Sequence, residues 1–135
     1  MDVAQALAFV EQHHMAVLAT RRRDGAPQMS LVTAGVDDDS KLVVSTRETA
    51  VKTKNVRRDP RVSLLVLDDT FRNWVQIDGT ADVLALPEAM EPLVDYYRRI
   101  SGEHPDWAEY RAAMEDQRRV LVRITAERAG PNVAG

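Results

Sequence analysis

The sequence predicts a mainly β fold, an antiparallel β-barrel with helices segregated beside it. Six apolar, β-prone segments alternate with turn signals, and most of their connections are short enough to be hairpins. Helical periodicity is confined to the N-terminus, one short basic segment and two segments near the C-terminus. A glycine-rich dinucleotide fingerprint and a P-loop are both absent, which argues against a parallel nucleotide-binding sheet. The length predicts one domain, residues 1–135.

The N-terminal third contains a helix signal and a hairpin signal. Apolar residues follow a helical period over residues 3–11, and Asp2 is placed to cap that helix. The dipeptide Asp24-Gly25 is typical of a turn between two strands. Three strands are therefore expected here, at residues 15–20, 27–36 and 41–46.

The middle of the chain predicts a basic helix between strands. The segment Val51–Pro60 follows one apolar run and precedes another, and Pro60 disfavours helix at the residue before it. Strands are expected at residues 61–67 and 74–86, and Gly79 within the second indicates a bulge or bend.

The C-terminal third predicts a pair of helices and a last strand. Pro87 suits the first position of a helix that runs to Ser101-Gly102, and a second helix is expected over residues 107–117. Alternating apolar residues predict a strand at 118–125, and the tail, residues 126–135, is expected to be irregular.

Composition excludes several classes of function. The hydrophobic share of 44% and charged share of 29% are ordinary for a globular protein, and no apolar run approaches a membrane span. The N-terminus lacks the pattern of a signal peptide, so a cytoplasmic location is expected. A net charge of −3 argues against a general nucleic-acid binder, and zero cysteines exclude disulfides and thiolate chemistry. The three histidines lack ligand spacing, so no metal site is expected.

No set of side chains in the sequence supplies a nucleophile or a general base. The serines lack a G-x-S-x-G context, and the run Asp37-Asp38-Asp39 reads as a polar turn. Catalytic residues are therefore not assigned, and an enzyme of this sequence would rely on a cofactor.

The basic segment is the most informative part of the chain. Four of the ten residues Val51–Pro60 are basic, in a chain of negative net charge. Helix starts attract anions, and a nearby lysine adds a point charge, so the segment is a candidate phosphate site at the rim of the sheet. A solvated basic helix is the alternative interpretation.

Several segments, in this order, resemble the pyridoxamine-phosphate-oxidase-like split β-barrel flavoproteins. Residues 44–47 and 51–64 resemble their flavin-phosphate segment, residues 25–30 their second barrel strand, and residues 78–81 their bulged fifth strand. Residues 97–107 through 118–121 resemble the actinobacterial branch that uses the deazaflavin coenzyme F420. The resemblance implies a six-stranded antiparallel split β-barrel, FMN-binding-like, that forms a homodimer.

The resemblance also implies a set of cofactor-binding residues. Lys52 matches the lysine that grips the cofactor phosphate, and Asn55 lies on the same helical face. Trp74 matches a position that the second subunit of family dimers presents to the cofactor. The complete set of candidates is Met29, Ser30, Val32, Ser45, Thr46, Arg47, Lys52, Lys54, Asn55 and Trp74.

The implied function is F420-dependent oxidoreduction of a small unsaturated molecule, such as an enone, quinone or lactone. FMN is the alternative cofactor, and a non-catalytic binder of F420 or haem is a further alternative. Val51 stands where the pyridoxamine-phosphate oxidases carry a second basic residue, and their C-terminal substrate segment is absent, so vitamin B6 oxidation is not expected. Arg21–Arg23 would favour the polyglutamate tail of F420, whereas Tyr96, Tyr97 and Trp107 read as helix-packing residues.

Overall fold

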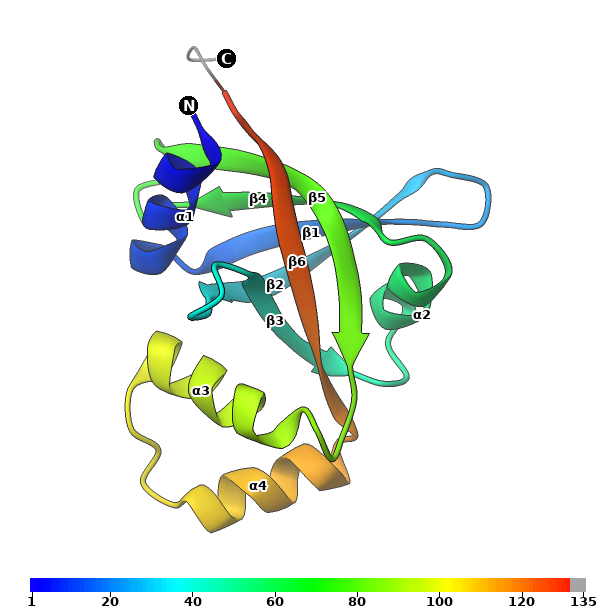
Figure 1. Cartoon of the computed structure of the whole chain (residues 1–135), viewed down its shortest axis with the longest axis vertical. Helices are drawn as coiled ribbons and strands as arrows, with labels where there is room; N and C mark the ends of the chain where they lie inside the picture. Colours follow the sequence, from blue (N-terminus) through cyan, green and yellow to red (C-terminus); the bar gives the residue numbers. More distant parts are fainter. Residues whose placement is uncertain (132–135) are drawn as a thin grey trace.

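Six antiparallel strands close a barrel in the order β1-β2-β3-β6-β5-β4 in the computed structural model, which describes residues 1–131 (Figure 1). The strands are β1 (Met15–Arg21), β2 (Pro27–Val36), β3 (Leu42–Arg47), β4 (Arg61–Leu67), β5 (Trp74–Leu84) and β6 (Arg119–Gly130). The helices are α1 (Val3–Gln12), α2 (Val51–Arg58), α3 (Met90–Ser101) and α4 (Trp107–Asp116). The predicted antiparallel barrel is confirmed.

The local signals in the sequence account for most element boundaries. Asp2 accepts a hydrogen bond from the Gln5 amide, and the Gln5 side chain accepts one from the Asp2 amide, so α1 begins with a capping box. Gly25 adopts a φ of +87° in the β1–β2 turn, a conformation that glycine adopts without a steric penalty. The basic helix α2 ends one residue before Asp59-Pro60, as expected.

The core lies inside the barrel, because alternate residues of each strand point inward. Leu18, Leu42, Leu64, Ile77 and Ile124 have no exposed surface. Side chains of this size each contribute about 1.5–3 kcal/mol when fully buried. Ala6 and Val10 of α1 belong to the same cluster, so the N-terminal helix packs on the barrel core.

The predicted bulge at Gly79 is confirmed. The register between β5 and β6 shifts between Asp78 and Gly79. A Cβ atom at Gly79 would lie 2.1 Å from the Thr125 carbonyl oxygen, so the two backbones approach too closely for a side chain.

Two predictions about the C-terminal third were wrong. Pro87 does not begin a helix: it follows a cis peptide bond in a turn, and α3 begins at Met90. A proline lacks an N–H group and therefore suits a turn as well as a helix start. Residues 126–130 are not irregular, because β6 continues to Gly130 and pairs with the part of β5 before the bulge. The rest of that predicted tail, residues 132–135, lies outside the described residues.

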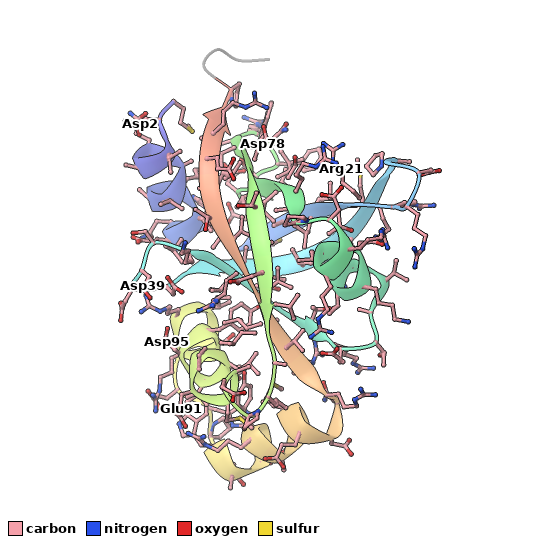
Figure 2. The ribbon with its side chains drawn as sticks, turned by 45° about the vertical axis from the view of Figure 1, so that its right-hand side comes forward. Asp2, Arg21, Asp39, Asp78, Glu91 and Asp95 are labelled. Atoms are coloured by element: carbon pink, nitrogen blue, oxygen red, sulfur yellow. The ribbon has the colours of Figure 1, made fainter. Side chains whose placement is uncertain are left out.

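Helices α3 and α4 lie side by side against the barrel (Figure 1), and a second hydrophobic cluster joins them to its outer surface. Its buried members are Val43, Ala89, Leu93, Val94, Tyr110, Met114 and Leu121. Arg99 of α3 fastens the helix pair to the barrel by donating to the Val36 carbonyl at the end of β2 and to Asp38 in the β2–β3 turn, and it also pairs with Asp95 within α3. Figure 2 shows this acidic side of α3, with Asp95 and Glu91 near the turn that carries Asp39.

No helix within residues 1–131 is both long enough and apolar enough to cross a membrane.

Candidate functional site

The barrel opens where β2 and β3 separate. The ladder between them joins only Ala34–Val36 to Leu42–Val44, although β2 is ten residues long. Beyond Ala34 and Val44 the strands part, and a cavity of about 500 Å³ lies at the gap. Its lining residues come from five further elements besides β2: they are Leu31, Val32, Thr33, Ser45, Thr46, Lys52, Tyr96, Tyr97, Tyr110, Met114 and Arg119.

The hydroxyl group of Tyr96 bridges the two separated strands. It donates a hydrogen bond to the Thr33 carbonyl, with an O···O distance of 2.7 Å, and accepts one from the Ser45 backbone. Thr33 and Ser45 directly follow the last residues that pair between β2 and β3, which are Ala34 and Val44. Burial raises the pKa of the Tyr96 phenol, so it remains a neutral donor and acceptor near neutral pH.

Three cationic side chains surround the cavity. Lys52, in the first turn of α2, and Arg119, at the start of β6, line it, and Arg47 pairs with Arg119 across β3 and β6. Burial, followed by the charge of Arg119, lowers the pKa of Lys52. Burial, followed by the charge of Arg47, lowers the pKa of Arg119. The three charges therefore oppose one another in the protein alone.

The cationic end of this cavity has no carboxylate in its lining within residues 1–131. No carboxylate within residues 1–131 lines the cavity or forms an ion pair with Arg47, Lys52 or Arg119. Ser45 and Thr46 add hydroxyl groups, and the first turn of α2 has no side-chain cap to occupy its N–H groups. This combination of donors suits an anion, and phosphate in particular.

An aromatic wall faces the cations. Tyr97 and Tyr110 line the cavity and pack in a ring cluster with His104 and Trp107, with centroids 5.1–5.8 Å apart. Tyr110 donates to the Leu93 carbonyl at 2.8 Å, and burial raises its pKa to about 12. The cavity thus has a cationic end and an apolar, aromatic side, as a ring-bearing phosphate ester requires.

The structure gathers part of the predicted site set. Val32, Ser45, Thr46 and Lys52 line the cavity, and Arg47 adjoins it. Met29, Ser30, Lys54, Asn55 and Trp74 do not line it. Trp74 lies at the opposite end of β5 from α3, in a separate cavity of about 320 Å³ with Gln76 and Arg128.

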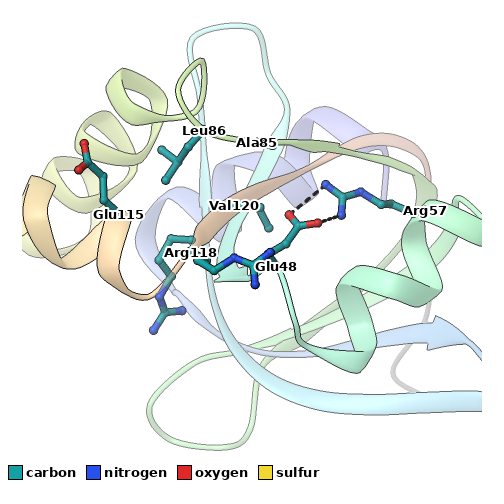
Figure 3. Close-up of a pocket in the computed structure, with 8 residues that line it drawn as sticks. Glu48, Arg57, Ala85, Leu86, Glu115, Arg118 and Val120 are labelled. Atoms are coloured by element: carbon teal, nitrogen blue, oxygen red, sulfur yellow. Dashed lines mark hydrogen bonds and ion pairs between the residues drawn. The ribbon is translucent and has the colours of Figure 1, made fainter.

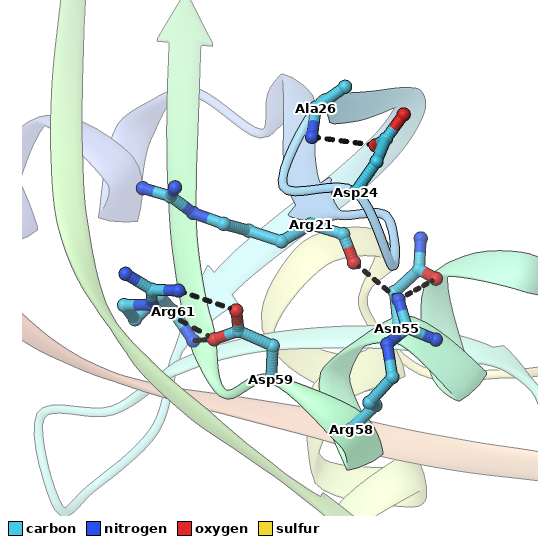
Figure 4. A network of polar contacts seen from close by, with 7 residues as sticks. All are labelled: Arg21, Asp24, Ala26, Asn55, Arg58, Asp59 and Arg61. Carbon is cyan, nitrogen blue, oxygen red and sulfur yellow. Dashed lines mark hydrogen bonds and ion pairs between the residues drawn. The ribbon is translucent and has the colours of Figure 1, made fainter.

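Asn55 forms hydrogen bonds with the barrel wall and does not line the cavity. Its side-chain amide donates to the buried Thr20 hydroxyl at 3.1 Å and accepts from Arg58 at 2.9 Å. Arg58 also donates to the Arg21 carbonyl, so the end of α2 is tied to the basic hairpin (Figure 4). Lys52 and this hairpin therefore lie at opposite ends of α2.

Sequence reasoning missed Arg119 and assigned Tyr96 and Tyr97 to helix packing alone. Arg119 begins the last strand, and only the β3–β6 register brings it opposite Arg47. The tyrosines pack as expected, but they also line the cavity at the gap between β2 and β3, which are distant from them in sequence.

A neighbouring cavity of about 270 Å³ shares Arg119 but has a different charge balance (Figure 3). Its lining includes Arg57 and Arg118, together with the carboxylates of Glu48 and Glu115. Glu48 forms an ion pair with Arg57 there. The offset charges make this cavity a poorer anion site than the one at the split.

Comparison with known proteins relates this geometry to one family. Residues 3–131 match the sequence model of the family described as pyridoxamine 5'-phosphate oxidase. A conserved hypothetical protein from Mycobacterium tuberculosis is 30% identical, with a TM-score of 0.77, over 100% of this chain and 93% of that one.

Two solved structures of lower identity share the fold. One is named F420 reductase: it is 20% identical, with a TM-score of 0.71, over 91% of this chain and 94% of that one. The other is a putative pyridoxamine 5'-phosphate oxidase from Listeria innocua, 22% identical, with a TM-score of 0.68 and 95% coverage of both chains.

Proposed function

Because this chain belongs to the pyridoxamine 5'-phosphate oxidase family of split β-barrels, we propose that its cavity binds a flavin-type cofactor and that the protein is an F420-dependent oxidoreductase. The observation that carries the proposal is the cationic end of the cavity, where Lys52, Arg119 and Arg47 lie beside two hydroxyl groups without a carboxylate. An anionic ligand relieves the repulsion among the three cations, and this relief adds to its binding free energy.

Different residues of the cavity would contact different parts of such a cofactor. Lys52 and Arg119 would bind the phosphate, Ser45 and Thr46 would donate hydrogen bonds to it, and Val32 would contact the ring system, since all five line the cavity. The chemistry that a bound reduced deazaflavin would supply is hydride transfer to an electrophilic carbon of an enone, quinone or lactone. The protein's part is to orient the two reactants and to exclude water, and the proton comes from solvent.

The deazaflavin is preferred to other cofactors on two grounds. The residues of α3 and α4 that resemble the F420-using branch form the aromatic wall of the cavity. A protein of the same fold is named F420 reductase. The expected substrate is a small unsaturated molecule.

FMN is the second candidate, and the number of cations favours it. A phosphate monoester such as that of FMN carries close to two negative charges at neutral pH, since its second pKa is about 6. A phosphodiester carries one. The phosphate of FMN, with close to two negative charges, therefore balances more of the charge of the three cations. F420 would need a carboxylate of its tail as well to balance them to the same extent.

We also propose that the protein is a homodimer through the outer face of β2, β1, β4 and β5. On this face Met15, Met29 and Leu31 are 54%, 65% and 87% exposed. Leu31 also lines the cavity, so the apolar face and the cavity are continuous. Exposed apolar surface of this kind is typical of protein–protein interfaces.

The test is a binding titration of F420 and FMN, followed by fluorescence, on the wild type and on Lys52→Ala. A charged hydrogen bond to phosphate contributes on the order of 1.5–3 kcal/mol, so Lys52→Ala should weaken binding roughly tenfold or more. Lys54→Ala is the matched control, because Lys54 lies on the same helix outside the cavity lining. Failure of both cofactors to bind the wild type would refute the proposal, and tighter binding of FMN would favour the second candidate.

A further inference from the structure

The chain has three lysines, Lys41, Lys52 and Lys54, and their surroundings differ. Lys54 is exposed on α2 and lies outside the lining of the cavity at the split. The Lys41 ammonium donates a hydrogen bond to the Thr125 hydroxyl, with an N···O distance of 2.6 Å. Lys52 is half-buried and lines the cavity, and within residues 1–131 it forms no ion pair with a carboxylate. Lys52 is therefore the lysine that a small molecule in the cavity would meet.

The surroundings of Lys52 favour a neutral amine. Burial, followed by the positive charge of Arg119, lowers the pKa of Lys52, so a larger fraction of its amine is neutral at a given pH than for an ordinary lysine. Only the neutral amine has a lone pair that can attack an electrophile, and burial or a neighbouring cation is the means by which proteins make a lysine nucleophilic. Lys52 thus combines access to a cavity with the properties of a nucleophile.

The groups around Lys52 select the kind of electrophile that would reach it. Arg119 lines the same cavity, and Arg47 pairs with Arg119 across β3 and β6. Ser45 and Thr46 add hydroxyl groups, and no carboxylate within the described residues lines this cavity. Such a set of donors binds phosphate, so it would concentrate a phosphorylated electrophile beside the amine and leave a neutral one unaffected.

Among phosphorylated electrophiles, an acyl phosphate makes the fullest use of these groups. Its phosphate is bonded directly to the electrophilic carbon, so a site that binds the phosphate also places that carbon near the amine. The phosphate is the leaving group as well. The cations that bind it would therefore also stabilise the negative charge that develops on it as the bond breaks.

We propose that Lys52 is an acylation site whose acyl donor is an acyl phosphate bound at the cationic end of the cavity. The neutral amine nitrogen attacks the acyl carbon, and an N–C bond forms. The bond from that carbon to the phosphate oxygen breaks, and phosphate leaves with the electron pair beside Arg119. The nitrogen releases a proton to water, so the products are an amide on Lys52 and inorganic phosphate.

Acylation would remove the positive charge of Lys52 and with it one of the donors to a bound phosphate. This consequence for the cofactor rests on the proposed function, whereas the acylation itself does not. The acylated protein should bind whichever of F420 and FMN binds the wild type as weakly as Lys52→Gln does.

Acetyl phosphate is the probe, and peptide mass spectrometry of the wild type gives the acetylation rate at each of the three lysines. A charged hydrogen bond concentrates the probe beside Lys52, so Lys52 should be acetylated roughly tenfold or more faster than Lys54. The N-hydroxysuccinimide ester of acetic acid is a neutral acetyl donor and should show a smaller preference for Lys52. Excess inorganic phosphate should slow the reaction of acetyl phosphate at Lys52 and leave the rate at Lys54 unchanged.

Arg119→Gln tests the role of the second cation. It removes a phosphate donor and the charge that lowers the pKa of Lys52, so acetylation of Lys52 by acetyl phosphate should slow roughly tenfold or more. The rate at Lys54 should not change. Arg118→Gln is the matched control, because Arg118 is the preceding residue and does not line this cavity.

Three results would overturn the inference. They are equal acetylation of the three lysines by acetyl phosphate, the same preference for Lys52 with the neutral ester, and a lack of protection by inorganic phosphate. Selective, phosphate-protected acetylation of Lys52 in a protein that binds neither cofactor would refute the proposed function and leave this inference intact.

Discussion

Replacement of Tyr96 by phenylalanine tests the interpretation of the split in the barrel. The substitution removes one hydroxyl group, and with it the hydrogen bond to Thr33 and the one from Ser45, but keeps the ring. A net contribution of about 0.5–1.5 kcal/mol for each bond gives an expected loss of about 1–3 kcal/mol in the free energy of unfolding. Water that enters the cavity can replace part of the two bonds, which favours the lower half of that range.

Urea unfolding of Tyr96→Phe and Tyr97→Phe is the appropriate pair of measurements. Tyr97 belongs to the same helix and the same cavity, but within residues 1–131 its hydroxyl group forms no hydrogen bond. Tyr97→Phe should therefore cost little. Equal midpoints for the two variants would refute the bridging role of Tyr96.

The pH dependence gives a second readout of the same residue. The pKa of Tyr96 is raised in the folded state, so the folded protein holds this proton more strongly than the unfolded chain. Its contribution to stability is fully present below the unfolded pKa, near 10, and is lost as pH rises through the folded pKa. The alkaline loss of stability should consequently be smaller in Tyr96→Phe than in the wild type.

Two further predictions concern the bulge and the basic hairpin. Gly79→Ala should lower the free energy of unfolding by roughly 3 kcal/mol or more, because its Cβ would meet the Thr125 carbonyl at 2.1 Å. Thermal unfolding measures this loss. Gly25→Ala is the control: its Cβ enters open space, so only the positive φ should matter, at a cost of about 1–2 kcal/mol. Replacement of Arg21–Arg23 by serine should weaken binding of long-tailed F420 at low salt but leave the affinity for FMN unchanged. The difference in F420 affinity between wild type and variant should vanish near 1 M salt, where the Debye length is about 3 Å. Equal affinity of the wild type for short-tailed and long-tailed F420 across a salt series would exclude the hairpin from tail binding.

The strands and helices could be predicted because their signals are local. Alternation of apolar residues, the Asp24-Gly25 turn and the cap at Asp2 each act within a few residues, and the structure follows them. The end of β6 could not be predicted in the same way. Its residues 126–130 carry no strong strand pattern, and they become a strand because β5 offers them a partner.

Only those cavity residues that lie close together in one segment of the sequence could be predicted. Lys52, Ser45 and Thr46 lie close together in sequence and were identified from their pattern and family resemblance. Arg119 and Tyr96 enter the cavity from elements more than 40 residues away from Lys52, through the barrel register and the docking of α3. Such contacts depend on tertiary packing, which a single sequence does not display.

The separation of the two hydrophobic clusters has a consequence for motion. Val43 and Leu121 point outward to α3 and α4, whereas their neighbours Val44 and Val122 point into the barrel. Within residues 1–131 the helix pair therefore shares no buried side chain with the barrel interior, so we expect it to unfold as a separate cooperative unit, at a lower free energy than the strands. Since α3 and α4 supply the aromatic wall of the cavity, transient opening of this unit would expose the cationic end and let a large ring system enter without any strand leaving the barrel.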